Sequence, residues 1–168
     1  MKSEEIQKYI QNLSPDLYSF AYVLVPDDLQ ASQLMIDGVQ SFLVQKKAFI
    51  DKILFAKNKS SISQFEEVKL CILKIIFELS KKRYQQLKMS FQVVELKGGF
   101  FSLDFEEKAV LYLKDKVHLE LTEIEYLTGL NKPELIASLY SARMKMVEIL
   151  ASLNINQNQT TFQSGGIL

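Results

Sequence analysis

The stretch from Leu121 to Arg143 constrains the fold most, because it has the layout of two helices separated by a sharp turn. Gly129 supplies a residue that tolerates the positive φ of such a turn. Asn131 is a good helix cap, and Glu134 three residues later completes the pattern of a capping box. The spacing therefore predicts a helix-turn-helix, a motif that often reads DNA with its second helix.

The second helix of this motif carries two apolar faces. Ile136 and Tyr140, followed by Met144 or Val147, recur at i, i+4 and i+8 on a face that a DNA-reading helix would turn toward phosphates and bases. An apolar face there indicates contact with a protein partner, or internal packing against residues 91–101 or the first half of the chain; both alternatives stay open. The other face, expected to be buried, consists of Leu135, Leu139, Ala142, Met146 and Leu150.

The rest of the chain also favours helices, because only three Pro and six Gly occur among 168 residues. We expect helices over residues 4–12, from Ser14-Pro15 to Leu24, from Asp27 or Asp28 to Leu43, and from about residue 63 to residue 89. Residues 46–55 are expected to extend the helical region, and residues 58–61 to form a loop.

These elements predict an all-α fold of two small helical domains, residues 1–90 and 103–153. Residues 91–102 include strand-like residues and Gly98-Gly99, which predict an extended linker or a short hairpin. Residues 154–168 are rich in Asn, Gln, Thr, Ser and Gly, so we expect a disordered tail.

Charge and composition narrow the classes of function. Lys and Arg together number 20, as do Asp and Glu, so the net charge is zero, and a neutral chain is a poor general binder of nucleic acid. Residues 103–168 carry nine acidic and six basic residues. No signal-peptide core opens the sequence, and no apolar run approaches the roughly 20 residues of a membrane span, so we expect a soluble, cytoplasmic protein without membrane contact.

Nothing in the sequence has the pattern of a catalytic or metal site. His118 is the only histidine and Cys71 the only cysteine, which makes a zinc site improbable. A nucleophilic Cys71–His118 pair is conceivable, but a buried thiol and a surface histidine are the better interpretation. We expect no enzyme, no cofactor and no small-molecule substrate.

With these motifs in place, the chain resembles a small bacterial RNA polymerase sigma factor of the extracytoplasmic-function type. Gly129-Leu130-Asn131 is similar to the family's Gly-Ile-Ser turn, and Ala142-Arg143 to its Arg-Ala-Arg ending. Leu17-Tyr18 and the helix from Val68 to Arg83 are similar to elements of region 2. The resemblance covers most of residues 13–150. It implies a region 2-like and a region 4-like domain, with core RNA polymerase and promoter DNA as partners.

The sequence departs from the family where those partners would bind. The acidic segment that docks on polymerase reads Ala31-Ser32-Gln33-Leu34-Met35-Ile36-Asp37, which retains only one acid. Ile136, Ser138 and Ser141 stand where the recognition helix of the family often carries basic residues. A divergent sigma-like transcription regulator is therefore one hypothesis, and a protein-interaction module that kept the fold but lost promoter recognition is the other.

Each hypothesis has its own candidate residues. The basic group Lys81-Lys82-Arg83, next to Tyr84, could grip a nucleic-acid strand, or it is a solvated helix end. The candidates for DNA contact are Lys81, Lys82, Arg83, Lys132, Arg143 and Lys145. The candidates for protein contact are Ile136, Tyr140, Val147, Leu34 and Asp37.

Overall fold

A computed structural model describes the backbone of residues 3–45, 61–90 and 99–163 and the side chains of residues 4–45, 64–89 and 99–152. Within these ranges every element is helical and no strand occurs, so the all-α prediction is confirmed. The helix expected over residues 46–55, the loop at 58–60 and the strand-like segment at 91–96 lie outside the described residues. Residues 99–102 of the expected linker form a short 3-10 helix, η1 (Gly99–Ser102).

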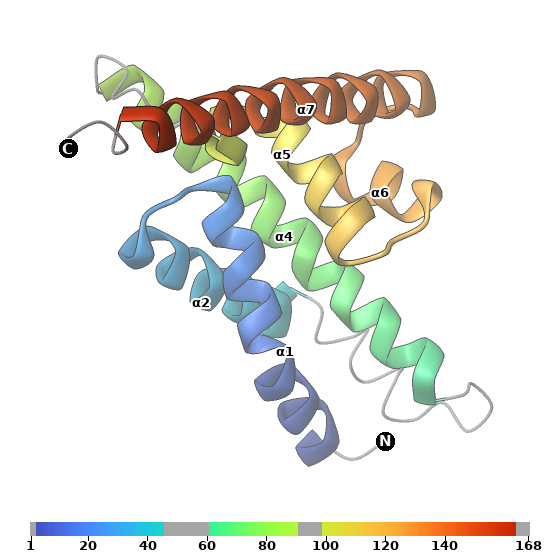
Figure 1. The fold of residues 1–168 in the computed structure, drawn as a ribbon. Coiled ribbons are helices and arrows are strands. Elements are labelled where there is room, and N and C mark those ends of the chain that lie inside the picture. The colour runs from blue at the N-terminus through green and yellow to red at the C-terminus, as the bar shows by residue number, and fades with distance from the viewer. Residues whose placement is uncertain (1–2, 46–60, 91–98, 164–168) are drawn as a thin grey trace.

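Three helices form the N-terminal group: α1 (Ser3–Leu24), α2 (Asp28–Gln45) and α4 (Ser61–Ser90). Each packs against the other two (Figure 1). The boundary expected at residues 26–28 is confirmed, because the Asp27 carboxylate accepts a hydrogen bond of 2.8 Å from the Gln30 N–H at the start of α2. At the crossing of α2 and α4, Gly38 is buried, and a Cβ there would lie 2.5 Å from Ile76 Cγ1.

The expectation of a break at Ser14-Pro15 is wrong, because α1 runs through both residues as one helix. Instead of capping a new helix, the Ser14 hydroxyl donates a 3.1 Å hydrogen bond to the Ile10 carbonyl. Proline lacks the backbone N–H of that turn, yet Leu13 and Leu17 on either side are both buried in the core. Burial of this face thus outweighs the local preference of proline for a helix start.

The C-terminal group consists of α5 (Phe105–Leu111), the π-helix η2 (Tyr112–Lys116), α6 (Leu121–Thr128) and α7 (Lys132–Gln163). Its helices share one hydrophobic core with the N-terminal group. Aromatic rings contact each other across the junction. The ring centres of Phe20 in α1 and Tyr112 lie 5.7 Å apart, and those of Phe77 in α4 and Phe105 in α5 lie 5.4 Å apart. The two groups of helices therefore pack directly on each other.

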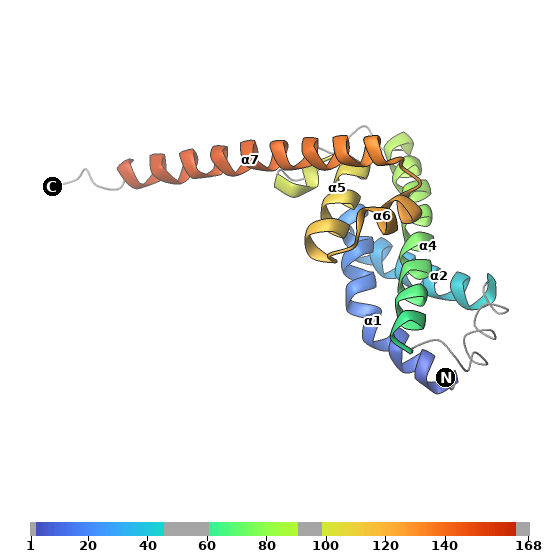
Figure 2. The ribbon, with the colours of Figure 1, turned by 90° about the vertical axis from the view of Figure 1, so that its right-hand side faces the viewer.

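The helix α7 is longer than the sequence pattern predicts. Its backbone remains helical through residues 154–163, where we expected the tail to begin, because no Pro or Gly interrupts the sequence between Pro133 and Gly165. Figure 2 shows that its C-terminal half projects past the other helices. Leu150, expected at the end of the buried face, is exposed, since the neighbouring elements do not reach that far along α7.

Candidate functional site

The junction of α6 and α7 has the geometry that the sequence predicts for the turn. Gly129 adopts φ 73° and ψ 5°, and its N–H donates a 2.9 Å hydrogen bond to the Glu125 carbonyl, which ends α6. Asn131 and Glu134 form a reciprocal capping box, in which each side chain accepts a hydrogen bond from the other's backbone N–H, at 3.0 and 2.9 Å. The local sequence therefore fixes where α7 begins.

Core packing holds α6 and α7 against the rest of the molecule. Leu135 and Ala142 are fully buried, while Leu130 and Leu139 are partly buried against the core. On the other side of α6, the Lys74 ammonium of α4 lies 4.1 Å from the centre of the Tyr126 ring. One face of α7 is thus committed to the interior.

A second face of α7 is exposed to solvent. The exposed fractions of its side chains are 50% for Ile136, 68% for Tyr140, 45% for Met144 and 62% for Val147. The spacing of four, four and three residues puts them in one row on the helix. Neither the N-terminal group nor residues 99–101 cover this row, so internal packing by these described residues does not occur. We call these four residues the exposed row.

Two basic side chains on the remaining surface of α7, Arg143 and Lys145, contact carboxylates of the same chain. Lys145 Nζ lies 2.8 Å and 2.9 Å from the two carboxylate oxygens of Glu107 and 3.1 Å from Asp104 Oδ2. Burial alone would raise the pKa of the Glu107 carboxyl, but hydrogen bonds from Lys145, Ser141 and the Asp104 N–H lower it below its ordinary value. Lys145 therefore ties α7 to α5.

Arg143 is engaged in a similar way with the π-helix η2. Its Nη2 lies 2.6 Å from Asp115 Oδ1. Both side chains are about half exposed, so this ion pair lies at the surface rather than in the core. Arg143 and Lys145, two of the six candidates for phosphate contact, thus already have carboxylate partners.

The basic cluster at the end of α4 is also partly engaged. Lys81 Nζ forms a 3.0 Å ion pair with Glu106 of α5, and the Tyr84 ring packs 5.2 Å from the Phe105 ring. Tyr84 is thus occupied internally and does not present an open face on which a base would stack. Among the described residues, Lys82, Arg83 and Lys132 form no ion pair; Lys82 and Lys132 are exposed, and Arg83 is half-buried.

The two candidates on α2 differ in position. Leu34 is buried against the neighbouring helices, because it continues the inward face of α2 with Ala31 and Phe42. Asp37 is half-buried and accepts a 2.8 Å hydrogen bond from the Gln33 side chain one turn earlier. Of these two, only Asp37 offers a polar group near the surface.

One unusual residue was not anticipated from the sequence. Lys108 of α5 is fully buried, and its ammonium nitrogen has no hydrogen-bond partner in the described part of the chain. The nitrogen lies 5.3 Å from the centre of the Tyr84 ring. Burial lowers the pKa of Lys108 below its ordinary value, while the nearby Asp104 carboxylate acts in the opposite direction. The sequence signal that could have indicated its burial is its position three residues after Phe105 and three before Leu111, on the buried face of α5.

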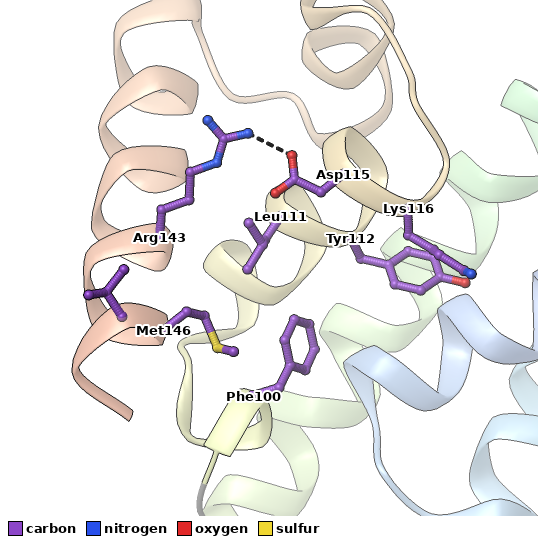
Figure 3. Close-up of a pocket in the computed structure, with 8 residues that line it drawn as sticks. Phe100, Leu111, Tyr112, Asp115, Lys116, Arg143 and Met146 are labelled. Atoms are coloured by element: carbon purple, nitrogen blue, oxygen red, sulfur yellow. Dashed lines mark hydrogen bonds and ion pairs between the residues drawn. The ribbon is translucent and has the colours of Figure 1, made fainter. Parts of the chain in front are cut away.

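A hollow lies between α7 and the elements that pack beside it (Figure 3). Its volume is about 530 Å³, and its lining comes from η1, α5, η2 and α7. The lining residues are Phe100, Leu111, Tyr112, Asp115, Lys116, Arg143, Met146 and Val147. Val147 belongs to both this pocket and the exposed row.

Other kinds of site were sought in the described ranges. No group of three or more His, Cys, Asp or Glu side chains there is placed to hold a metal ion. His118 is exposed in the segment before α6 and has φ 61°. In the described structure no hydrogen bond joins it to Cys71. Cys71 is half-buried, and its Sγ lies 4.0 Å from the Tyr126 hydroxyl. None of the helices in this part of the chain has both the length and the apolar character needed to cross a bilayer.

Comparison with known proteins adds no relative: no family model matches the chain, and neither curated proteins nor solved structures give a match. The resemblance to sigma factors therefore rests on the residues quoted above.

Proposed function

We propose that the chain is a protein-interaction module on a sigma-like helix-turn-helix scaffold, and that it binds its partner through the exposed row of α7. The observation that supports this most is the exposure of Ile136, Tyr140 and Val147 on the helix that would otherwise read DNA. Apolar side chains grouped on one helix face are typical of a surface that another protein covers.

The shape of this surface suits recognition of a protein along the helix. Apolar anchors that recur every three or four residues along one face are the pattern by which an amphipathic helix occupies an apolar groove of its partner. From Ile136 to Val147 the row extends about 16 Å, at about 1.5 Å per residue. Tyr140 lies near its centre and is the most exposed member, and tyrosine is among the residues that contribute most to interface affinity.

The second candidate function is a divergent sigma-like transcription regulator that binds RNA polymerase, promoter DNA or both. The specific observation in its favour is the capped junction of α6 and α7, with Gly129 in the left-handed conformation. The charges weigh against it, because Lys81, Arg143 and Lys145 contact Glu106, Asp115 and Glu107. Phosphates would have to displace these carboxylates, so the affinity gained from each basic residue is reduced.

A binding experiment separates the two functions. The chain is titrated with core RNA polymerase and, in parallel, with duplex and forked DNA across a salt series. Under the first proposal, Tyr140→Asp abolishes binding to polymerase or another protein partner, while Ser152→Asp, on the same helix outside the row, does not. Circular dichroism checks that both variants remain folded.

The opposite result supports the second candidate. DNA binding that weakens steeply with salt, is lost when Lys81, Lys82 and Arg83 are changed to Glu, and is unaffected by Tyr140→Asp would overturn the first proposal. A partner other than polymerase is sought with a photo-crosslinking amino acid at position 140 and, as a control, at position 152. Crosslinking of equal extent at both positions would also contradict the role of the row.

A further inference from the structure

The pocket beside α7 has two chemically distinct parts (Figure 3). Its floor is apolar and is formed by Leu111, Met146 and the ring of Phe100, which come from three different elements. Asp115 and Arg143 lie together at one side, whereas the Lys116 side chain points to the other side, along the Tyr112 ring. The hollow is open to solvent on one side, and its volume of about 530 Å³ is comparable with that of small-molecule sites.

Arg143 is the group on this side of the pocket that can bind an anion. In the described structure its charge is balanced by Asp115, and Lys116 points away from it. The guanidinium of Arg143 has five N–H donors, and in the described structure it makes a single contact, from Nη2 to Asp115 Oδ1. The remaining donors allow a second carboxylate to bind Arg143 in the two-pronged geometry that guanidinium groups prefer.

The backbone of η2 contributes to this arrangement. The Val117 N–H donates a 3.1 Å hydrogen bond to the Tyr112 carbonyl five residues earlier, which is the hydrogen-bond pattern of a π-helix. Short π-helices occur frequently at functional sites, since they alter the direction of the side chains that follow. Here the widened turn carries both Asp115 and Lys116 at the edge of an apolar pocket.

We propose that this pocket binds a small amphiphilic carboxylate, as a ligand rather than as a substrate. The hydrocarbon or aromatic body of the ligand occupies the floor between Phe100, Leu111 and Met146. Its carboxylate binds Arg143 and competes with Asp115 for the guanidinium. The ligand thereby replaces the direct contact between η2 and α7. This inference does not depend on the proposed function, because the isolated chain is sufficient to test it.

Two methionines provide a reporter and an internal control for the test. Met146 lines the pocket, whereas Met144, two residues earlier, belongs to the exposed row. The chain is labelled with ¹³C at the methionine methyl groups and titrated with decanoate below its micellar concentration, and separately with decanol. We expect decanoate to shift the Met146 methyl resonance saturably with little change at Met144. Decanol has the same chain without the charge, and we expect it to bind about tenfold more weakly.

The ion pair gives the sharpest comparison, because its two members should act in opposite directions. We expect Arg143→Gln to weaken decanoate binding about tenfold, through loss of a charge-assisted contact. Asp115→Asn removes the competing carboxylate and should tighten binding severalfold. Arg83→Gln, at the only other arginine, should leave the affinity unchanged. Both pocket variants break the same ion pair, so a loosened α7 would change the affinity in the same direction in both.

Three results would overturn the proposal. The first is an equal response to decanol and decanoate, which would reduce the site to an unspecific apolar surface. The second is an affinity of Arg143→Gln equal to that of the unchanged chain. The third is the absence of any saturable shift of Met146 at millimolar decanoate.

Discussion

Replacement of Lys108 by methionine tests most directly how this fold tolerates a buried cation. Lys108 is fully buried, its nitrogen has no hydrogen-bond partner in the described structure, and it lies 5.3 Å from the centre of the Tyr84 ring. Methionine has a similar unbranched shape and carries no group that needs a hydrogen bond. The substitution Lys108→Met therefore removes the polar group and retains most of the packing.

The magnitudes decide the sign of the effect. Transfer of an ammonium ion into a protein interior costs several kcal/mol, and a desolvated cation–π contact returns about 2 kcal/mol. If the amine is neutral instead, the unsatisfied group still costs about 1–3 kcal/mol. We therefore expect Lys108→Met to raise the free energy of unfolding by about 1–3 kcal/mol. At about 3 °C per kcal/mol for a chain of this size, Tm rises by about 3–9 °C.

The pH dependence adds an independent check. The pKa of Lys108 is lowered in the folded state, so between that folded pKa and the ordinary value of 10.5 the unfolded chain binds more protons than the folded one. In that window the stability contributed at this position rises with pH. The advantage of Lys108→Met over the unchanged chain should therefore shrink toward pH 10.5. Below the folded pKa it should be constant.

Urea unfolding followed by circular dichroism at pH 7 and pH 9.5 measures both effects. Lys82→Met, at an exposed lysine, is the matched control and should change stability by less than about 0.5 kcal/mol. A Lys108→Met variant that is less stable than the unchanged chain would refute the reasoning. It would mean that attraction of the ammonium group to the Tyr84 ring and the Asp104 carboxylate outweighs the cost of its burial.

Three further substitutions probe the junctions between helices. Gly38→Ala should destabilise by about 1–3 kcal/mol in thermal unfolding, because the new methyl group meets Ile76, and an unchanged Tm would mean that α2 and α4 separate easily. Gly129→Ala should cost about 1–2 kcal/mol in urea unfolding, since φ is positive there, and no loss would contradict the strain argument. Lys145→Met should lower the free energy of unfolding by about 1–3 kcal/mol, because Glu107 is left buried without its cation. The ionised Glu107 stabilises the fold above pH 4.5, and this stabilisation is lost as the pH falls; in an acid titration the variant should show less of it. An unaltered acid transition in that variant would show that the Lys145 contact does not stabilise the Glu107 carboxylate.

Local patterns in the sequence were sufficient for much of the fold. The capping residue Asn131, the turn at Gly129 and the boundary at Asp27 each depend on a few adjacent residues, and each lies where it was expected. The continuous helix through Pro15 did not follow from such patterns. Its cause is tertiary, because burial of the surrounding face against α2 and α4 overrides the local preference of Ser-Pro.

The candidate site was less accessible to sequence reasoning for a similar reason. The apolar spacing of Ile136 and Tyr140 was visible, but whether that face is covered depends on elements distant in sequence. The ion pairs of Arg143 with Asp115 and of Lys145 with Glu107 span 28 and 38 residues, so no local pattern indicates them. The same holds for the pocket, whose lining is assembled from four elements.

The length of α7 gives the pocket a mechanical consequence. From Met146, which packs against the core, to its end at Gln163 the helix extends about 25 Å, at about 1.5 Å per residue. A helix of this length moves as a rigid rod that pivots near Arg143 and Met146. When such a rod tilts, the displacement grows with distance from the pivot. Exchange of Asp115 for another anion at Arg143 would therefore displace the C-terminal end of α7 much more than the residues that line the pocket.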